Sequence, residues 1–120
     1  MSEQALVVRR FEPLSALTQQ RGRFVQLMRR HVLAQDVSKT DHDLAQAVYF
    51  RFLKAPELWK SKEVLPRQTA QLFDQRQRYT EIMRRHVHAD DEGKSDIDFV
   101  RDVYARYAHW REVPLIDPNE

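Results

Sequence analysis

Cysteine is absent from the 120 residues of this chain, so neither disulfide bonds nor thiol chemistry are available to it. This absence fits a reducing compartment. Glycine occurs only twice, and runs of β-branched residues are scarce. Because glycine destabilises helices and β-branched residues favour strands, this composition predicts a helical protein.

Long apolar segments are also missing from the chain. No window approaches the ~18 consecutive apolar residues that mark a membrane-spanning helix. Residues 1–4 include an acidic side chain and lead into no long apolar run, so we expect no secretory signal. We therefore expect a cytoplasmic protein with no membrane partner.

Recognisable catalytic and metal-binding signatures are lacking as well. We find no Ser/His/Asp order, no suitable carboxylate pair and no glycine-rich phosphate loop. His31 and His86 have no His-x-x-x-His or Glu-x-x-His spacing around them. Residues 36–43 lack the residue order of a calcium-binding loop. We therefore predict a protein that is not an enzyme and that holds no cofactor and no metal.

Charge is nearly balanced, because 20 basic and 18 acidic residues give a net charge of +2. So small an excess is weak support for a nucleic-acid partner. Fifteen of the basic residues are arginines, whose side chains make bidentate contacts with phosphate and carboxylate groups. The alternative explanation is a GC-rich genome, which raises arginine content for no structural reason.

The strongest feature of the sequence is an internal repeat. The segment Met-Arg-Arg-His-Val occurs at residues 28–32 and again at residues 83–87. Residues 23–53 align without a gap to residues 78–108, with 14 identities in 31 positions. Average composition would produce about two or three identities by chance. The chain is therefore interpreted as an internal duplication.

Each repeat is predicted to be one helical hairpin. Residues 13–54 form the first, residues 55–65 link the two, and residues 66–111 form the second, all within a single domain of residues 1–120. A hairpin cannot bury its apolar face alone, so the fold class that we predict is all-α, a pseudo-two-fold four-helix bundle. The alternative is a homodimer, swapped or paired through its hairpins, in which each chain completes the core of the other.

Helix boundaries follow from proline, from apolar spacing and from N-terminal caps, which we expect at Thr40 with Asp43 and at Ser95 with Asp98. The first helix is expected at about residues 13–34 and the second at residues 41–54. The third is expected to begin at Pro66, and the fourth to cover about residues 96–111. The apolar positions expected to face inward are Leu17, Phe24, Leu27, Met28, Val32, Leu44, Ala47, Val48, Phe52, Leu72, Tyr79, Ile82, Met83, Val87, Phe99, Val103, Tyr107 and Trp110.

Arginines recur on the first and third predicted helices. Arg23 and Arg30 share one helix face, and Arg78 and Arg85 repeat them. Two such stripes could grip a phosphate backbone, because backbone contacts dominate nucleic-acid affinity. Alternatively, arginines at the end of a helix, Arg29 and Arg30 in the first repeat, form ion pairs across the hairpin. Their expected partners are the repeated aspartates at the start of the next helix, Asp41 and Asp43.

Three further pairs are repeated. Arg51 and Arg106 lie close to the apolar face, where they extend to solvent or meet an acid such as Asp102. Tyr49 and Tyr104 lie off the main apolar stripe, as interface anchors or as packing between the hairpins. The histidines of the repeated segment fall on the apolar face, and we expect them to be buried, neutral and hydrogen-bonded.

The sequence thus favours a non-enzymatic helical module that binds a protein, as an adaptor, assembly factor or regulator. The alternative is a nucleic-acid-binding protein that uses the arginine stripes. In both cases the candidate binding residues are Arg23, Arg30, Tyr49, Arg78, Arg85 and Tyr104.

Overall fold

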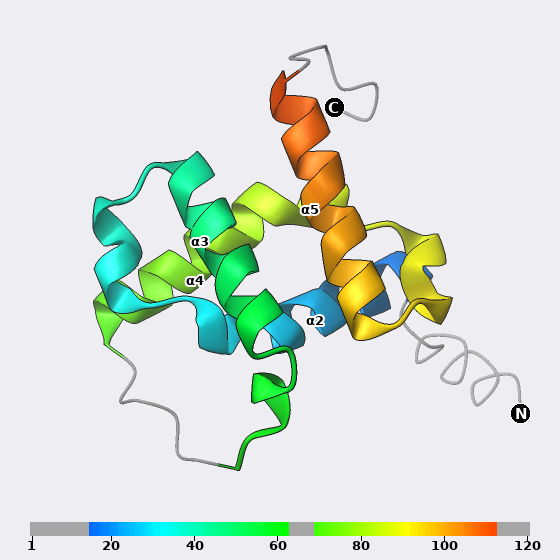
Figure 1. Ribbon diagram of the computed structural model, residues 1–120, viewed down its shortest axis with the longest axis horizontal. Coiled ribbons are helices and arrows are strands. Elements are labelled where there is room, and N and C mark those ends of the chain that lie inside the picture. Colours follow the sequence, from blue (N-terminus) through cyan, green and yellow to red (C-terminus); the bar gives the residue numbers. More distant parts are fainter. Residues whose placement is uncertain (1–14, 63–68, 113–120) are drawn as a thin grey trace, which may run out of the picture.

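Helices account for all of the regular structure described by the computed structural model, which covers residues 15–62 and 69–112 (Figure 1). Neither range contains a strand, which confirms the predicted all-α class. Pro13, Pro66 and the segment before residue 13 lie outside the described residues. The α-helices of these described residues are α2 (Ala16–Met28), α3 (Asp41–Lys54), α4 (Ala70–Met83) and α5 (Asp96–Glu112).

The repeated Met-Arg-Arg-His-Val segment ends its helix instead of continuing it. We predicted a first helix that extends to about residue 34, but α2 ends at Met28. The chain then tightens into the short 3₁₀ helix η1 (Arg29–His31), becomes extended at Val32, and turns again through η2 (Ala34–Ser38).

The same sequence of turns follows α4. This helix ends at Met83 and is followed by η4 (Arg84–His86) and η5 (Ala89–Gly93). We refer to residues 29–40 as the first connection and to residues 84–95 as the second connection.

Capping side chains fix where the α-helices begin. Ser15, Thr40 and Thr69 each accept a hydrogen bond from the backbone N–H three residues later. The Ser95 hydroxyl accepts one from the N–H of Asp98 in the same way. These bonds satisfy donors that the first helical turn leaves without intrahelical partners. The caps that we predicted at Thr40 and Ser95 are therefore confirmed.

One core joins all four α-helices. In Figure 1, α3 and α5 lie in front of α2 and α4 and run across them. At the centre, the ring of Phe24 on α2 stacks on Tyr79 of α4, with centroids 5.9 Å apart. The same ring meets Phe99 of α5 edge to face, also at 5.9 Å. After α3, the short helix η3 (Leu58–Lys60) places Trp59 against this core.

Apolar spacing predicted most of the core. Of the expected inward positions only Trp110 is exposed, with 37% of its surface accessible, so its assignment to the core was wrong. Trp110 lies in the last turns of α5, beyond Tyr107, which is the last buried residue of that helix. Ala45 and Val100 are buried although they were not predicted, so the buried stripes of α3 and α5 are wider than expected. Partial burial is found for Leu17, Ala47 and Ile82.

Among the described helices, none combines the length and the apolar character that crossing a bilayer requires.

We expect the substitution Phe99→Ala to lower the free energy of unfolding by about 3–5 kcal/mol, because it leaves a cavity where three helices meet. Phe50→Ala is the matched control, because 48% of Phe50 is exposed on α3. The control should change stability by only about 0.5 kcal/mol. Urea denaturation followed by circular dichroism measures both values, and equal losses would contradict this description of the core.

Candidate functional site

A buried ion pair organises the first connection. Asp36 has no exposed side-chain surface and accepts hydrogen bonds from Nη1 and Nη2 of Arg51, at 2.8 and 2.9 Å. It also accepts from the backbone N–H of Leu33, while Nη1 of Arg51 donates to the carbonyl of His31. Burial alone would raise the pKa of Asp36, but the bonds from Arg51 and Leu33 and the nearby positive charges lower it. Asp36 is therefore held as a carboxylate.

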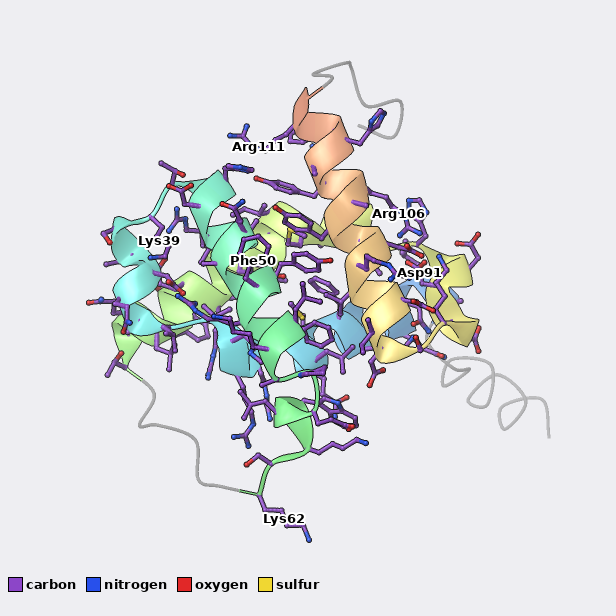
Figure 2. The ribbon with its side chains drawn as sticks, in the orientation of Figure 1. Lys39, Phe50, Lys62, Asp91, Arg106 and Arg111 are labelled. Atoms are coloured by element: carbon purple, nitrogen blue, oxygen red, sulfur yellow. The ribbon has the colours of Figure 1, made fainter. Side chains whose placement is uncertain are left out.

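The second connection contains the same arrangement (Figure 2). Asp91 is fully buried and accepts from both Nη atoms of Arg106, at 2.8 and 2.9 Å, and from the N–H of His88 at 2.9 Å. The Lys94 ammonium group adds a contact of 2.8 Å. Burial would raise the pKa of Asp91, but these bonds lower it well below its usual range. Arg106 therefore pairs with Asp91, and our suggestion of Asp102 was wrong, because Asp102 pairs with Lys94.

A second arginine reaches each connection from the opposite repeat. Nε of Arg78 on α4 donates to the Asp41 carboxylate at 2.9 Å, and its Nη atoms donate to the backbone carbonyls of Asp36 and Lys39. The partner expected for Asp41 was an arginine of its own repeat, so the predicted pairing was wrong. The reason is the break at Met28, which folds the first connection back against α4.

Arg23 on α2 makes the corresponding contacts with the second connection. Its Nη2 donates to the Asp96 carboxylate at 2.9 Å and to the Lys94 carbonyl at 2.6 Å. Its Nη1 donates to the Asp91 carbonyl at 3.4 Å and to the Gln20 side chain at 3.2 Å. Arg23 and Arg78, both candidate binding residues, thus direct their guanidinium groups into the fold.

The other four candidate binding residues lie in three different settings. Tyr49 and Tyr104 stack on each other between α3 and α5, with ring centroids 4.2 Å apart and planes within 5°. Nη2 of Arg30 donates to the carbonyl of Ser61, at 3.0 Å. The Arg85 guanidinium lies over the ring of Trp110, 5.1 Å from its centre. The six predicted residues are therefore divided among separate environments.

The repeated histidines are buried, as predicted. Only 3% of His31 and 6% of His86 are exposed, and their rings meet Phe52 and Tyr107 edge to face. Burial and the nearby charge of Arg51 lower the pKa of His31, which keeps its ring neutral. Its Nε2 atom finds no hydrogen-bond partner among the described residues, so the hydrogen bond that we expected is missing at this atom. In the described part of the chain, no three acidic or histidine side chains are placed to hold a metal ion.

The described residues also form two concave surfaces that were not predicted from the sequence. The first, which we call the α2–α4 groove, has a volume of about 230 Å³. It leaves Val25 37% exposed and Phe73 47% exposed, while Arg29 and Arg76 also line it. Its lining contains no carboxylate among the described residues, and its remaining members are Phe24, Met28, Val32, Gln77, Tyr79 and Thr80.

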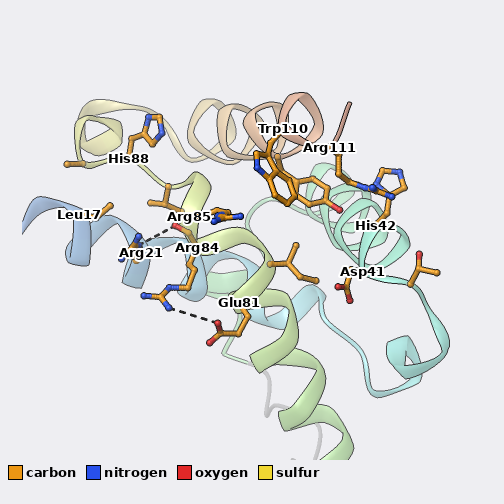
Figure 3. A pocket seen from close by; sticks show the side chains of 15 residues that line it. Leu17, Arg21, Asp41, His42, Glu81, Arg84, Arg85, His88, Trp110 and Arg111 are labelled. Atoms are coloured by element: carbon orange, nitrogen blue, oxygen red, sulfur yellow. Dashed lines mark hydrogen bonds and ion pairs between the residues drawn. The ribbon is translucent and has the colours of Figure 1, made fainter. Parts of the chain in front are cut away.

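The second surface, which we call the α4–α5 pocket, is larger, at about 1130 Å³ (Figure 3). Trp110 covers it, Arg21 and Arg84 lie at one end, and His42 and Arg111 lie at the other. The remaining lining residues are Leu17, Thr40, Asp41, Glu81, Ile82, Arg85, Val87, His88, Ala89 and Tyr107.

Comparisons with protein families, with curated proteins and with solved structures found no match for this chain.

We expect Arg51→Ala to lower the free energy of unfolding by about 3–5 kcal/mol, because it leaves the buried Asp36 carboxylate without its main partner. The matched control is Arg101→Ala, which breaks the exposed pair of Arg101 and Asp98 on α5. Exposed pairs of this kind contribute about 0.2–1 kcal/mol. Urea denaturation at neutral pH compares the two variants, and an Arg51→Ala effect no larger than the control would show that the pair does not stabilise the fold.

Stability should also depend on pH through Asp91. The pKa of Asp91 is lower in the folded state than in the unfolded state. The ionised carboxylate therefore stabilises the fold at pH values above its unfolded-state pKa of about 3.9. This contribution is lost as the pH falls through the folded value. Arg106→Gln removes the main cause of the lowered pKa. The difference in free energy of unfolding between wild type and variant should therefore decrease as the pH falls from about 5 to about 2.5. Urea midpoints across this range test the prediction, and a constant gap would contradict it.

Proposed function

We propose that the chain is an internal duplication, with residues 13–54 and 66–111 as hairpins related by a pseudo-two-fold axis. The contacts described above support this proposal, because they recur with the 55-residue offset of the sequence repeat. For example, Nε of Arg21 donates to the carbonyl of Arg84, and Nε of Arg76 donates to the carbonyl of Arg29, both at 3.2 Å. Each repeat thus supplies the same donors to the other.

We further propose that this duplicated fold is a non-enzymatic module that binds a protein, as an adaptor, assembly factor or regulator. The observation that carries the proposal is the α2–α4 groove. It exposes Val25 and Phe73 above an apolar floor and is lined by two arginines, with no carboxylate in its described lining. A buried apolar anchor beside a charged rim is the usual arrangement of a protein interface.

Electrostatics define the partner more closely. Burial lowers the pKa of Arg76, and the charges of Arg29 and Arg30 lower it further, so positive charge accumulates at this rim. An acidic residue of a partner would relieve this repulsion, whereas a basic one would increase it. We therefore propose a partner segment that inserts an apolar side chain between Val25 and Phe73 and places a carboxylate near Arg29.

Nucleic acid is the competing partner. The arginine stripes suggested it, but Arg23 and Arg78 donate to carboxylates and carbonyls of the connections. Using them to bind phosphate would require breaking these internal hydrogen bonds. Because backbone contacts supply most nucleic-acid affinity, the loss of two arginines from the stripes favours the protein partner.

Site-specific photocrosslinking tests the proposal. A benzoylphenylalanine in place of Phe73 should crosslink one protein in extracts of the cells that make this chain. The same group in place of Ile97, which is 46% exposed on α5 and outside the groove lining, is the positional control. Arg29→Glu in the Phe73-labelled chain should reduce the crosslink at least about tenfold, because it reverses a charge of the rim.

Three outcomes would contradict the proposed partner. The first is an equal yield from positions 73 and 97, and the second is a crosslink that Arg29→Glu leaves unchanged. The third is tight binding of nucleic acid, in which log affinity falls with log salt by about 0.7–0.9 for each phosphate contact.

A further inference from the structure

We infer that the α4–α5 pocket binds a small organic anion that carries an apolar ring. This inference does not depend on the proposed protein partner, because the α2–α4 groove is a different surface with different lining residues.

Size and rings indicate the apolar part of the ligand. The pocket volume of about 1130 Å³ is slightly above the range of about 300–1,000 Å³ that is usual for small-molecule sites. Trp110 is 37% exposed in its wall, while Tyr107 and His42 stack with centroids 6.2 Å apart and planes within 20°. The exposed indole of Trp110 favours a planar ring, which gains stacking contacts as it leaves water.

Charge indicates the other part of the ligand. Among the described residues, the lining contains four arginines and two carboxylates, an excess of two positive charges (4 − 2). Both carboxylates already have arginine partners, since Asp41 meets Arg78 at 2.9 Å and Glu81 meets Arg84 at 4.0 Å. An anion therefore complements the pocket, whereas a cation would add to the positive excess.

Arg111 and His42 define where the anionic group would bind. They lie together at one end of the pocket (Figure 3), where the His42 ring stacks on Tyr107. Among the described residues, Arg111 has no carboxylate partner within ion-pair distance. Nδ1 of His42 is buried and has no hydrogen-bond partner in the same part of the chain. A carboxylate, sulfonate or phosphate group placed here would receive a charge-assisted bond from Arg111.

The pocket contains its own fluorescent reporter. The chain has two tryptophans, and Trp59 packs on the core outside the pocket lining. Its Nε1 atom has no hydrogen-bond partner among the described residues, so Trp59→Phe removes no such bond. In the Trp59→Phe chain, all tryptophan emission comes from Trp110. Quenching of this emission therefore reports a ligand in the pocket.

The test uses 1-anilinonaphthalene-8-sulfonate as the anionic probe and N-phenyl-1-naphthylamine, which has the same rings and no charge, as its neutral counterpart. We expect the sulfonate to quench Trp110, to saturate at one molecule per chain, and to bind about tenfold more tightly than the neutral probe, as one charge-assisted hydrogen bond allows. Arg111→Gln should remove that difference, and Arg111→Lys should retain most of it.

Two matched variants control for adventitious binding. Arg101→Gln removes an arginine of the same helix that is outside the pocket, and Phe73→Ala removes an exposed ring of the α2–α4 groove. Neither variant should change the affinity of the sulfonate. Unsaturable binding, equal affinity of the two probes, equal effects of Arg111→Gln and Arg101→Gln, or loss of binding in Phe73→Ala would each overturn the inference. Circular dichroism and urea midpoints verify that every variant is folded before titration.

Discussion

The fold depends on the pairing of two buried carboxylates, Asp36 and Asp91, with Arg51 and Arg106. An isolated buried charge costs several kcal/mol, so each carboxylate is compatible with the core only while its arginine is in place. Each pair also supplies hydrogen bonds to the backbone, since Asp36 receives the N–H of Leu33 and Arg51 caps the carbonyl of His31. The regular structure of the connections consists of short 3₁₀ helices, and these side chains provide hydrogen-bond partners that a longer α-helix would otherwise provide.

Local chemistry explains which parts of the fold could be predicted from the sequence. Apolar spacing identified most of the core, and a hydroxyl three residues before an aspartate identified the caps at Thr40 and Ser95. The helix end at Met28 was missed, because Arg-Arg-His-Val is compatible with a continuing helix in its local propensities. The break there involves Asp36, whose carboxylate accepts from the N–H of Leu33 and is paired with Arg51, 15 residues further along the chain. A tertiary contact of this kind has no local signal in the sequence.

The candidate sites were harder to predict for a different reason. The candidate binding residues were chosen because they are repeated in the two halves. Repeated residues such as Arg23 and Arg78, however, hold the connections in place. The residues that give the α4–α5 pocket its character are not shared. His42 corresponds, 55 positions away, to Ile97, and Trp110 and Arg111 lie beyond the aligned residues 78–108. Residues that differ between the repeats or lie outside them therefore distinguish this pocket, whereas the identical residues hold the shared architecture.

Each half of the chain supplies an arginine to the connection of the other half, and these reciprocal contacts constrain how the chain can unfold. Arg23 braces the connection of the second half, and Arg78 braces that of the first. If one half of the chain unfolds, both connections lose their arginine contacts with the other half. The connection of the half that stays folded is thereby weakened as well. The two halves therefore behave as a single cooperative unit despite their similar sequences, unlike repeat arrays in which each unit contacts only its neighbours and can fray from an end.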